Sequence, residues 1–299
     1  MITPTTKAAL LALAASLLFT LETLAVKALV GVPIATLVLA RAIGQLAWTV
    51  PDLIRSPARL VHTNELPMQV FRGLLSAVAW YLYYVSFSGM PLATATVLSF
   101  TTVLFVTAMA APLLGEKVGW RRWTATLAGF AGVLIIMRPG MVPVGIPVLA
   151  AIAASVFGAG ILITTKRLAR TERTVTIMFY VGVVALAVSL PVALPGLAWP
   201  GWWNMGLLVA AGFLGPSAMW VWISALRMAD ASFIAPLSYV RLLFAAGFGV
   251  ALFGEVPEWW LLPGGALIIG STLYITRREA MLQRTRAASS AAGSSAKSA

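Results

Sequence analysis

The sequence contains no cysteine, a single histidine and few charged residues. Without cysteine, the chain forms no disulfide and no thiolate metal site. One histidine, His62, excludes a Ser-His-Asp triad, an HExxH zinc helix and a proton relay built on several histidines. A GxxxxGKS or GxxxxGKT loop is also missing, so the chain has no P-loop for a nucleotide. We therefore expect no enzyme, no catalytic residue, no metal and no cofactor.

Apolar residues dominate instead and make up 60% of the 299 positions. About 20 consecutive apolar residues form a helix that crosses a bilayer, and such runs follow one another almost from end to end. Their length favours helices over the short alternating strands of a barrel. The expected fold is all-α and integral to the membrane, with ten transmembrane helices at roughly 8–29, 33–53, 68–88, 91–114, 122–138, 145–166, 174–194, 204–227, 231–253 and 259–276.

The net charge of +12 is distributed unevenly over the connections between these runs. Most Lys and Arg residues, Arg72 among them, fall on the side of the N-terminus, and only Lys27 and Arg138 fall on the other side. This asymmetry predicts cytoplasmic N- and C-termini by the positive-inside rule. The basic excess then serves topology and contact with the lipid bilayer, and we expect no nucleic-acid partner. The small, polar residues of 280–299 predict a disordered cytoplasmic tail.

Two stretches of the chain are versions of each other. Residues 95–116 read ATVLSFTTVLFVTAMAAPLLGE, and residues 234–255 read IAPLSYVRLLFAAGFGVALFGE. At an offset of 139, Leu98-Ser99 aligns with Leu237-Ser238, and Gly115-Glu116 aligns with Gly254-Glu255. Ten helices then divide into two five-helix repeats, 1–140 and 141–279. An odd number per repeat inverts the second one, and inverted repeats are typical of secondary transporters.

These paired segments resemble the drug/metabolite transporter superfamily, in its ten-helix metabolite-exporter (EamA-type) branch with the YddG-type aromatic amino-acid exporters. The Gly-Glu pairs that end the fourth and ninth helices carry the resemblance best, and it extends over nearly the whole chain. Phe19-Thr20 stands where the family commonly has Trp-Gly, and the fourth helix lacks the proline often found there. The resemblance implies a multi-pass carrier of a bacterial-type inner membrane, functional as a monomer.

Charged side chains within membrane spans are costly and usually functional or paired. Glu22 and Arg41 lie at matching distances from the outer ends of the first two helices, so both are expected ~12 Å below the surface. Gln45 lies one turn from Arg41 on the same face. The set predicts a structural ion pair; the alternative is that Arg41 holds a substrate carboxylate or forms an outer gate.

Arg241 is expected ~15 Å deep in the ninth helix, close to the membrane midplane. No acidic residue is expected in the middle of another helix to neutralise it. A buried, unpaired cation is costly, so Arg241 is expected to face water, carbonyl groups or an anionic ligand. Substrate contact and a structural role both remain open.

The remaining candidates for substrate contact lie on the third, fourth, eighth and ninth helices. The third helix carries an aromatic face, which either lines a cavity or packs the bundle. Pro236 removes a backbone hydrogen bond and is a candidate bend or gate. The full set of further candidates is Trp80, Tyr83, Tyr84, Ser99, Phe100, Trp222, Ser238 and Tyr239.

Taken together, the residues predict a secondary transporter that exports amino acids, including aromatic ones, or similar small metabolites by alternating access. Glu22, next to Arg41, is a poor proton carrier because an opposite charge stabilises its ionised form, which favours a facilitative carrier. The alternative is a proton-coupled exporter of other metabolites or drugs. An intramembrane enzyme is disfavoured because no nucleophile and base share a depth.

Overall fold

The computed structural model describes residues 4–114, 120–138, 144–169, 171–226, 228, 235–271, 273–275, 277–278 and 281. All regular elements in this part of the chain are helical. They are α1 (Pro4–Ala28), α2 (Ile34–Ala47), α3 (Val50–Arg55), α4 (Pro57–Val61), α5 (Leu66–Gly89), α6 (Leu92–Ser99), α7 (Thr102–Leu114), α8 (Trp120–Met137), α9 (Ile146–Leu168), α10 (Thr174–Ala193), the 3-10 turn Leu194–Gly196, α11 (Trp202–Leu226), the 3-10 helix Ala235–Tyr239 and α13 (Val240–Phe253). Residues 261–271 and 273–275 form a last helical stretch. The tail expected over 280–299 lies almost entirely outside the described residues.

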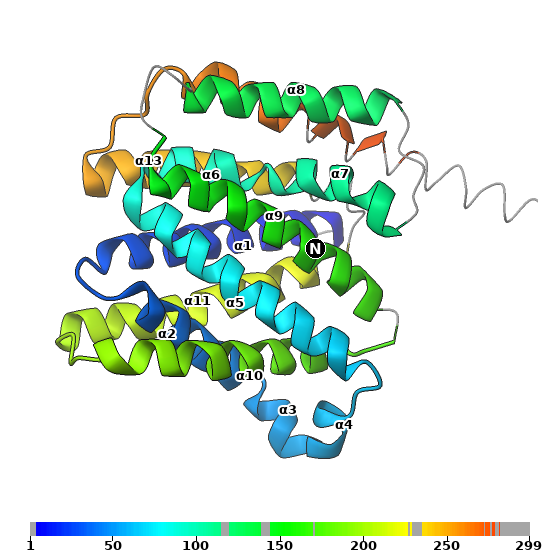
Figure 1. Ribbon diagram of the computed structural model, residues 1–299, viewed down its shortest axis with the longest axis vertical. Helices are drawn as coiled ribbons and strands as arrows, with labels where there is room; N and C mark the ends of the chain where they lie inside the picture. Colours follow the sequence, from blue (N-terminus) through cyan, green and yellow to red (C-terminus); the bar gives the residue numbers. More distant parts are fainter. Residues whose placement is uncertain are drawn as a thin grey trace, which may run out of the picture.

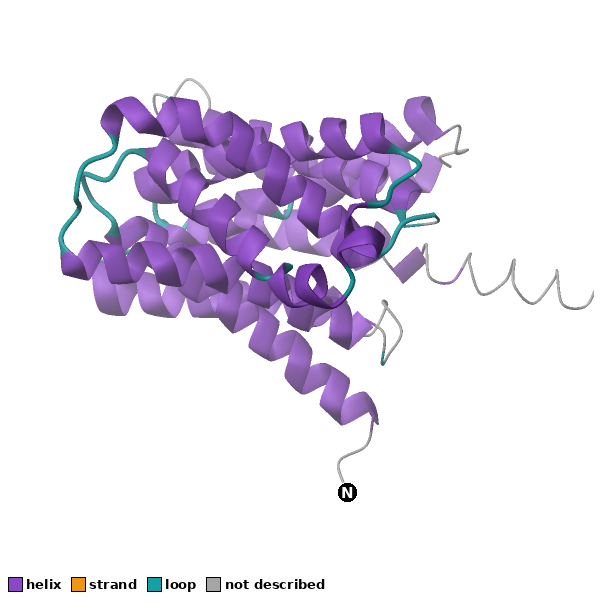
Figure 2. Ribbon diagram, turned by 90° about the horizontal axis from the view of Figure 1, so that it is seen from below, coloured by secondary structure: helices purple, strands orange, loops and turns teal. Residues whose placement is uncertain are grey.

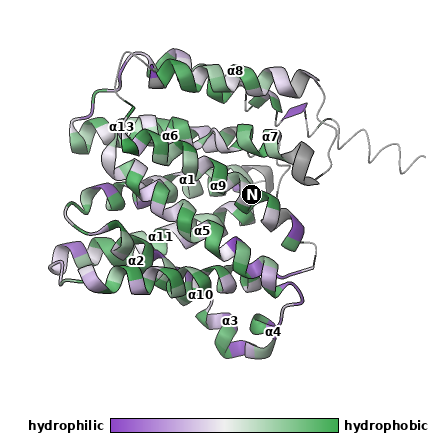
Figure 3. Cartoon of the chain, viewed as in Figure 1, coloured by the Kyte–Doolittle hydropathy of each residue, from purple (hydrophilic) through white to green (hydrophobic). Residues whose placement is uncertain are grey.

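The long helices run side by side along one direction, from α8 at one edge of the bundle to α10 at the other (Figures 1 and 2). Seven described helices are long and apolar enough to cross a membrane, and three shorter ones, Trp123–Ile136, Leu237–Phe253 and Leu261–Ile275, are also apolar. Hydrophobic residues cover the helices, and hydrophilic ones gather toward their ends and around α3 and α4 (Figure 3). We call the end of the bundle where α1 finishes and α6 begins the distal end.

The fourth predicted helix, 91–114, is divided into α6 and α7 at Phe100 and Thr101. Hydroxyl groups explain the break, because Ser and Thr side chains compete with amide groups for nearby carbonyls. Ser99 Oγ donates to the Thr96 carbonyl at 2.7 Å, and Thr101 Oγ1 donates to the Leu98 carbonyl at 2.6 Å. The Thr101 amide also reaches Leu98, which tightens the chain to a 3-10 turn.

The ninth predicted helix, 231–253, is interrupted at the matching place. Its described part is a 3-10 helix, Ala235–Tyr239, followed by α13 from Val240. Pro236 lies in the 3-10 helix and has no amide hydrogen to continue an α-helical ladder. Phe100 and Tyr239, the residues at the two breaks, are 139 positions apart, so the two similar segments of the sequence are interrupted at the same aligned position.

The second predicted helix, 33–53, is also shorter than expected. It ends at Ala47, and the chain turns into the short helices α3 and α4, which project beside α10 (Figure 1). Thr49 Oγ1 donates to the Leu46 carbonyl at 2.7 Å, and Pro51 lies in the first turn of α3, which begins at Val50. A proline favours the first turn of a helix and breaks a preceding one, so the apolar run continues through a change of direction.

Glycines let several helices approach closely. A Cβ atom on Gly132 of α8 would lie 2.6 Å from the Gly264 carbonyl oxygen, and one on Gly264 would lie 2.7 Å from the Gly132 carbonyl oxygen. Gly129 lies equally close to Leu104 and Ser271. These glycines therefore permit close packing of the helices. At Gly270, by contrast, a Cβ would meet no atom within 4 Å.

Candidate functional site

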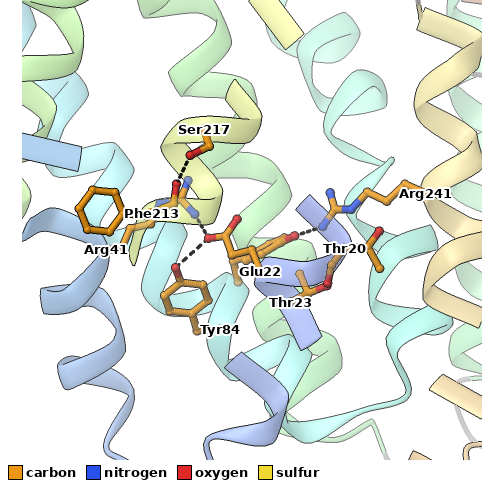
Figure 4. Close-up of polar contacts among 9 residues, drawn as sticks. Thr20, Glu22, Thr23, Arg41, Tyr84, Phe213, Ser217 and Arg241 are labelled. Carbon is orange, nitrogen blue, oxygen red and sulfur yellow. Dashed lines mark hydrogen bonds and ion pairs between the residues drawn. The ribbon is translucent and has the colours of Figure 1, made fainter. Parts of the chain in front are cut away.

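Glu22 of α1 forms an ion pair with Arg41 of α2 inside the bundle (Figure 4). The Glu22 side chain is 1% exposed and the Arg41 side chain 9% exposed. Tyr84 of α5 donates its hydroxyl hydrogen to Glu22 Oε1 at 2.9 Å. A carboxylate removed from water requires such compensation, because both the charge and its hydrogen-bonding capacity must be satisfied. Three helices of the first repeat therefore meet at one carboxylate.

The guanidinium group of Arg41 is enclosed on its other sides. Its Cζ lies 4.7 Å from the centroid of the Trp80 ring, within the range of a cation–π interaction. Gly215 of α11 faces the same guanidinium, and a Cβ atom there would collide with it. Arg41 Nε is buried without a hydrogen-bond partner. Gln45, expected from the sequence to join the ion pair, is buried one turn away. The described contacts of the pair are instead with Tyr84 and Trp80.

Arg241 of α13 lies in an aromatic cage and not next to an acid. Its guanidinium donates to the Tyr83 hydroxyl oxygen. The ring centroids of Phe19, Tyr83 and Phe87 lie 5.4, 5.7 and 5.7 Å from its Cζ. Arg241 Nε is buried without a partner, and no carboxylate of the described residues pairs with the group. The cage thus holds a cation with unused capacity for hydrogen bonds.

The two arginine sites are neighbours. Tyr83 and Tyr84 are consecutive residues of α5, and their ring centroids are 6.1 Å apart. Tyr83 contacts Arg241, and Tyr84 contacts Glu22. Figure 4 shows Arg41 and Arg241 on opposite sides of the α1 segment that carries Glu22. Two consecutive residues of α5 therefore contact the two charged sites, Tyr83 at Arg241 and Tyr84 at the Glu22–Arg41 pair.

Phe100 and Tyr239 meet beside this cage. Their ring centroids are 4.8 Å apart, at an interplanar angle of 78°. Edge-to-face packing of this kind is favourable for aromatic rings. Tyr239 also stands two residues before Arg241 in the chain. The predicted residues Tyr83, Phe100, Tyr239 and Arg241 are thus brought to one region by α5, the α6–α7 break and α13.

Other predicted residues lie elsewhere. Ser99 uses its hydroxyl within its own helix, and Ser238 belongs to the 3-10 helix that also contains Pro236. Trp222 packs with Leu237 against Ala8 and Ala12, away from the aromatic cage. Tyr84 is 1% exposed and bound to Glu22, so it supports the ion pair and does not line the cage.

Two contacts could not be predicted from the sequence. Phe19 completes the cage around Arg241, together with Phe87 of the aromatic face predicted for the third helix. At the end of α13, Lys27 and Glu255 form an ion pair that joins this helix to α1. In the sequence, Lys27 indicates only topology, and Glu255 indicates only the repeat.

Arg72 lies within the predicted third helix and turns its side chain inward. It is part of α5 and is only 9% exposed. Its Nε donates to Thr165 Oγ1 at 2.8 Å, and its Nη1 donates to Ser76 Oγ at 3.2 Å. Gln69, one turn earlier, is fully buried with both amide atoms unpartnered. Long side chains near a helix end can fold inward when hydroxyl groups receive them.

The cage combines three kinds of group. Arg241 supplies a cation, Tyr83 a hydroxyl group, and the rings of Phe19 and Phe87 supply apolar faces. In general, such groups suit a carboxylate attached to an apolar or aromatic body.

Comparison with known proteins agrees with a transport function. An S-adenosylmethionine uptake transporter of Rickettsia felis is 30% identical over 73% of this chain and 74% of its own length. A riboflavin transporter of Brucella anthropi is 29% identical over 85% and 92%, and a pseudopaline exporter of Pseudomonas aeruginosa is 28% identical over 90% and 95%. These relatives support transport of small metabolites and do not single out aromatic amino-acid exporters.

Structural comparison gives the same architecture. A crystal structure of a protein of 22% identity superimposes with a TM-score of 0.61 and covers 91% of this chain and 98% of that one. The EamA-like transporter family model matches residues 6–138 and again residues 145–277. The chain is a multi-pass bacterial membrane protein and belongs to the EamA-like transporter family.

Proposed function

We propose that this protein exports amino acids, including aromatic ones, or closely similar small metabolites by alternating access. The observation that carries the proposal is Arg241, a cation in an aromatic cage without a carboxylate partner among the described residues. A substrate carboxylate would satisfy its charge and the unpartnered Nε, since carboxylates bind guanidinium groups through paired hydrogen bonds. The apolar body of the substrate would contact Phe19 and Phe87.

The proposed architecture has ten transmembrane helices in two inverted repeats, 1–140 and 141–279, with both termini in the cytoplasm. Seven long and three shorter apolar helices support that number. The shared break at Phe100 and Tyr239 supports the repeat, and the distribution of basic residues supports the orientation. In this orientation the distal end faces outward. One chain contains both repeats, so we propose that the monomer is functional.

The ion pair between Glu22 and Arg41 favours a facilitative carrier. Glu22 is the only carboxylate that the structure describes deep among the cage helices, and it is engaged by Arg41 and Tyr84. Because both partners occupy this buried carboxylate, we infer that it does not carry protons during transport. A proton-coupled exporter of other metabolites or drugs is the alternative, and it would require the Glu22–Arg41 ion pair to open during transport.

A second substrate is favoured by the relatives. S-adenosylmethionine is itself an amino acid with a large aromatic substituent, and its uptake is the named activity of a 30% identical relative. It offers Arg241 the same carboxylate. Uptake and export differ only in the direction of the gradient for a facilitative carrier, so substrate range distinguishes the two candidates better than direction does.

Counterflow in proteoliposomes tests the proposal. Vesicles preloaded with one unlabelled amino acid should accumulate the labelled form, with phenylalanine, tryptophan, leucine and S-adenosylmethionine compared in parallel. The matched controls are the corresponding amines, which lack the carboxylate. Each amine retains the apolar body of its amino acid and cannot pair with Arg241. Accumulation of amines equal to that of the amino acids would overturn the role of the carboxylate. Accumulation of S-adenosylmethionine alone would favour the second candidate.

A further inference from the structure

Lys27 and Glu255 connect four membrane helices at the distal end. Lys27, in the last turn of α1, pairs with Glu255, which follows α13. Its Nζ also donates to the Met90 carbonyl at 2.6 Å, just beyond the end of α5. Its charge lies 5.6 Å from the centroid of the Phe253 ring. One ammonium group thus bridges the ends of α1, α5 and α13.

The carboxylate of Glu255 extends the connection to α6. Its Oε2 accepts a hydrogen bond from the Leu92 amide at 2.8 Å. Leu92 is the first residue of α6, where free amide groups attract an anion. Gly254 adopts a left-handed conformation, with φ +63°, and turns the chain so that the Glu255 amide donates to the Gly249 carbonyl. This turn explains why a Gly-Glu pair ends the helix.

The ion pair joins the two predicted repeats. α1, α5 and α6 belong to residues 1–140, and α13 belongs to residues 141–279. Any movement that separates α13 from α1 at the distal end must break Lys27–Glu255. The side chains are 14% and 12% exposed. They are therefore more accessible than Glu22, at 1%. Breaking Lys27–Glu255 thus leaves charges that water can reach more easily, and it costs less than breaking Glu22–Arg41.

A lysine and a glutamate also stand at the positions that the repeat aligns with Lys27 and Glu255. At the offset of 139, Lys27 corresponds to Lys166 and Glu255 corresponds to Glu116. The side chains of Lys166 and Glu116 lie outside the described part of the structure. An inverted repeat places equivalent residues at opposite ends of a carrier, so a device built from this pair would be available at both ends.

We propose that Lys27 and Glu255 form the distal gate of the carrier, closed in this structure and broken when the distal end opens for exchange of substrate. This inference rests on transport by alternating access, but not on the substrate class. A second ion pair at the distal end provides a matched control. Arg138 pairs with Glu258, whose side chain is 65% exposed, and it also approaches the ring of Trp260. Loss of this pair should not open the gate.

Thiol labelling tests the gate without any substrate. Since the chain has no cysteine, Ser99→Cys introduces a single reporter thiol at the break between α6 and α7. A membrane-impermeant thiol reagent is applied to vesicles of both orientations. Lys27→Met and Glu255→Gln should each raise the labelling rate about five- to tenfold, as for a coupling of ordinary size. The rise should occur from one side of the membrane only, while Arg138→Gln leaves the rate unchanged.

A variant that keeps the charge makes the test decisive if a neutral variant folds poorly. Lys27→Arg retains a cation that can pair with Glu255 and donate to the Met90 carbonyl, and it should leave labelling within about twofold of the reporter protein. Each protein is first shown to elute as a single species from size exclusion. Parent-like labelling in both neutral variants would overturn the gate, as would a rise of equal size in Arg138→Gln. A wrong substrate class changes none of these rates, so the two proposals fail separately.

Discussion

Phe100 and Tyr239 occupy equivalent positions of the two repeats and contact each other edge to face, with ring centroids 4.8 Å apart. Each residue stands where its transmembrane segment is interrupted, between α6 and α7 and before α13. Two equivalent residues can touch only near the axis that relates them, since each is the image of the other. In the proposed inverted repeat, the pseudo-symmetry axis would pass close to these rings and to neighbouring Arg241.

The two rings should act together in transport. Phe100→Ala and Tyr239→Ala are each expected to reduce the initial counterflow rate about tenfold, because each removes one side of the contact beside the cage. The double variant should lose little more than either single one, as expected for residues in direct contact. Tyr239→Phe keeps the ring and is the control. Losses that multiply in the double variant would show that the rings act independently.

Arg241 is expected to be essential for substrates that carry a carboxylate. Arg241→Gln should reduce the initial counterflow rate at least a hundredfold, because the substrate loses its buried charge pair with the protein. A hundredfold loss corresponds to about 3 kcal/mol. The measurement is counterflow on protein whose thermal stability in detergent is unchanged. Arg173→Gln removes an exposed cation and serves as the control. Full activity of Arg241→Gln would exclude direct contact with the substrate.

The Glu22–Arg41 pair should stabilise the bundle. Glu22→Gln or Arg41→Gln alone leaves an uncompensated buried charge, and each is expected to destabilise by about 3–5 kcal/mol. The double variant should recover part of this loss, because neither charge then remains. Thermal unfolding in detergent measures the stability of the parent protein, the two single variants and the double variant. Tyr84→Phe, which removes one hydrogen bond to a charged group, should cost about 1.5–3 kcal/mol. Strict additivity of the two single losses would argue against a structural pair.

The close approach of α8 to the last helix should depend on Gly264. Gly264→Ala places a Cβ against the Gly132 carbonyl oxygen and is expected to destabilise by about 1–3 kcal/mol, as overpacking does. Gly270→Ala, in the same helix, meets no atom within 4 Å and is the matched control. It should stabilise by at most about 1 kcal/mol in the same thermal unfolding assay, since alanine favours a helix more than glycine does. Equal effects of the two substitutions would indicate helix propensity and not packing.

Transport should not require a proton gradient. If Glu22 stays bound to Arg41 and Tyr84, collapsing the gradient with a protonophore is expected to leave the initial counterflow rate unchanged within about twofold, since the carrier moves no net proton. A known proton-coupled carrier in the same vesicles verifies the collapse. Strong loss of flux would identify the protein as proton-coupled and would make Glu22 the first residue to substitute.

Much of this protein follows from the sequence. Long apolar runs must become helices in a membrane, because lipid offers backbone groups no other hydrogen-bond partner. The offset of 139 identifies the repeat, and equal depth on neighbouring helices predicts that Glu22 and Arg41 can meet. Arg241 is recognisable as unusual because a charge at mid-membrane is costly wherever it points.

Only the tertiary structure decides what surrounds these charges. Whether Arg241 meets an acid or a ring depends on how α1, α5 and α13 are rotated against one another, and spacing along one helix does not determine that rotation. It also turns Arg72 inward and places Lys27 beside Glu255, more than 200 positions away in the chain. The sequence determines which groups are buried in the membrane, and packing between helices determines which of them become partners.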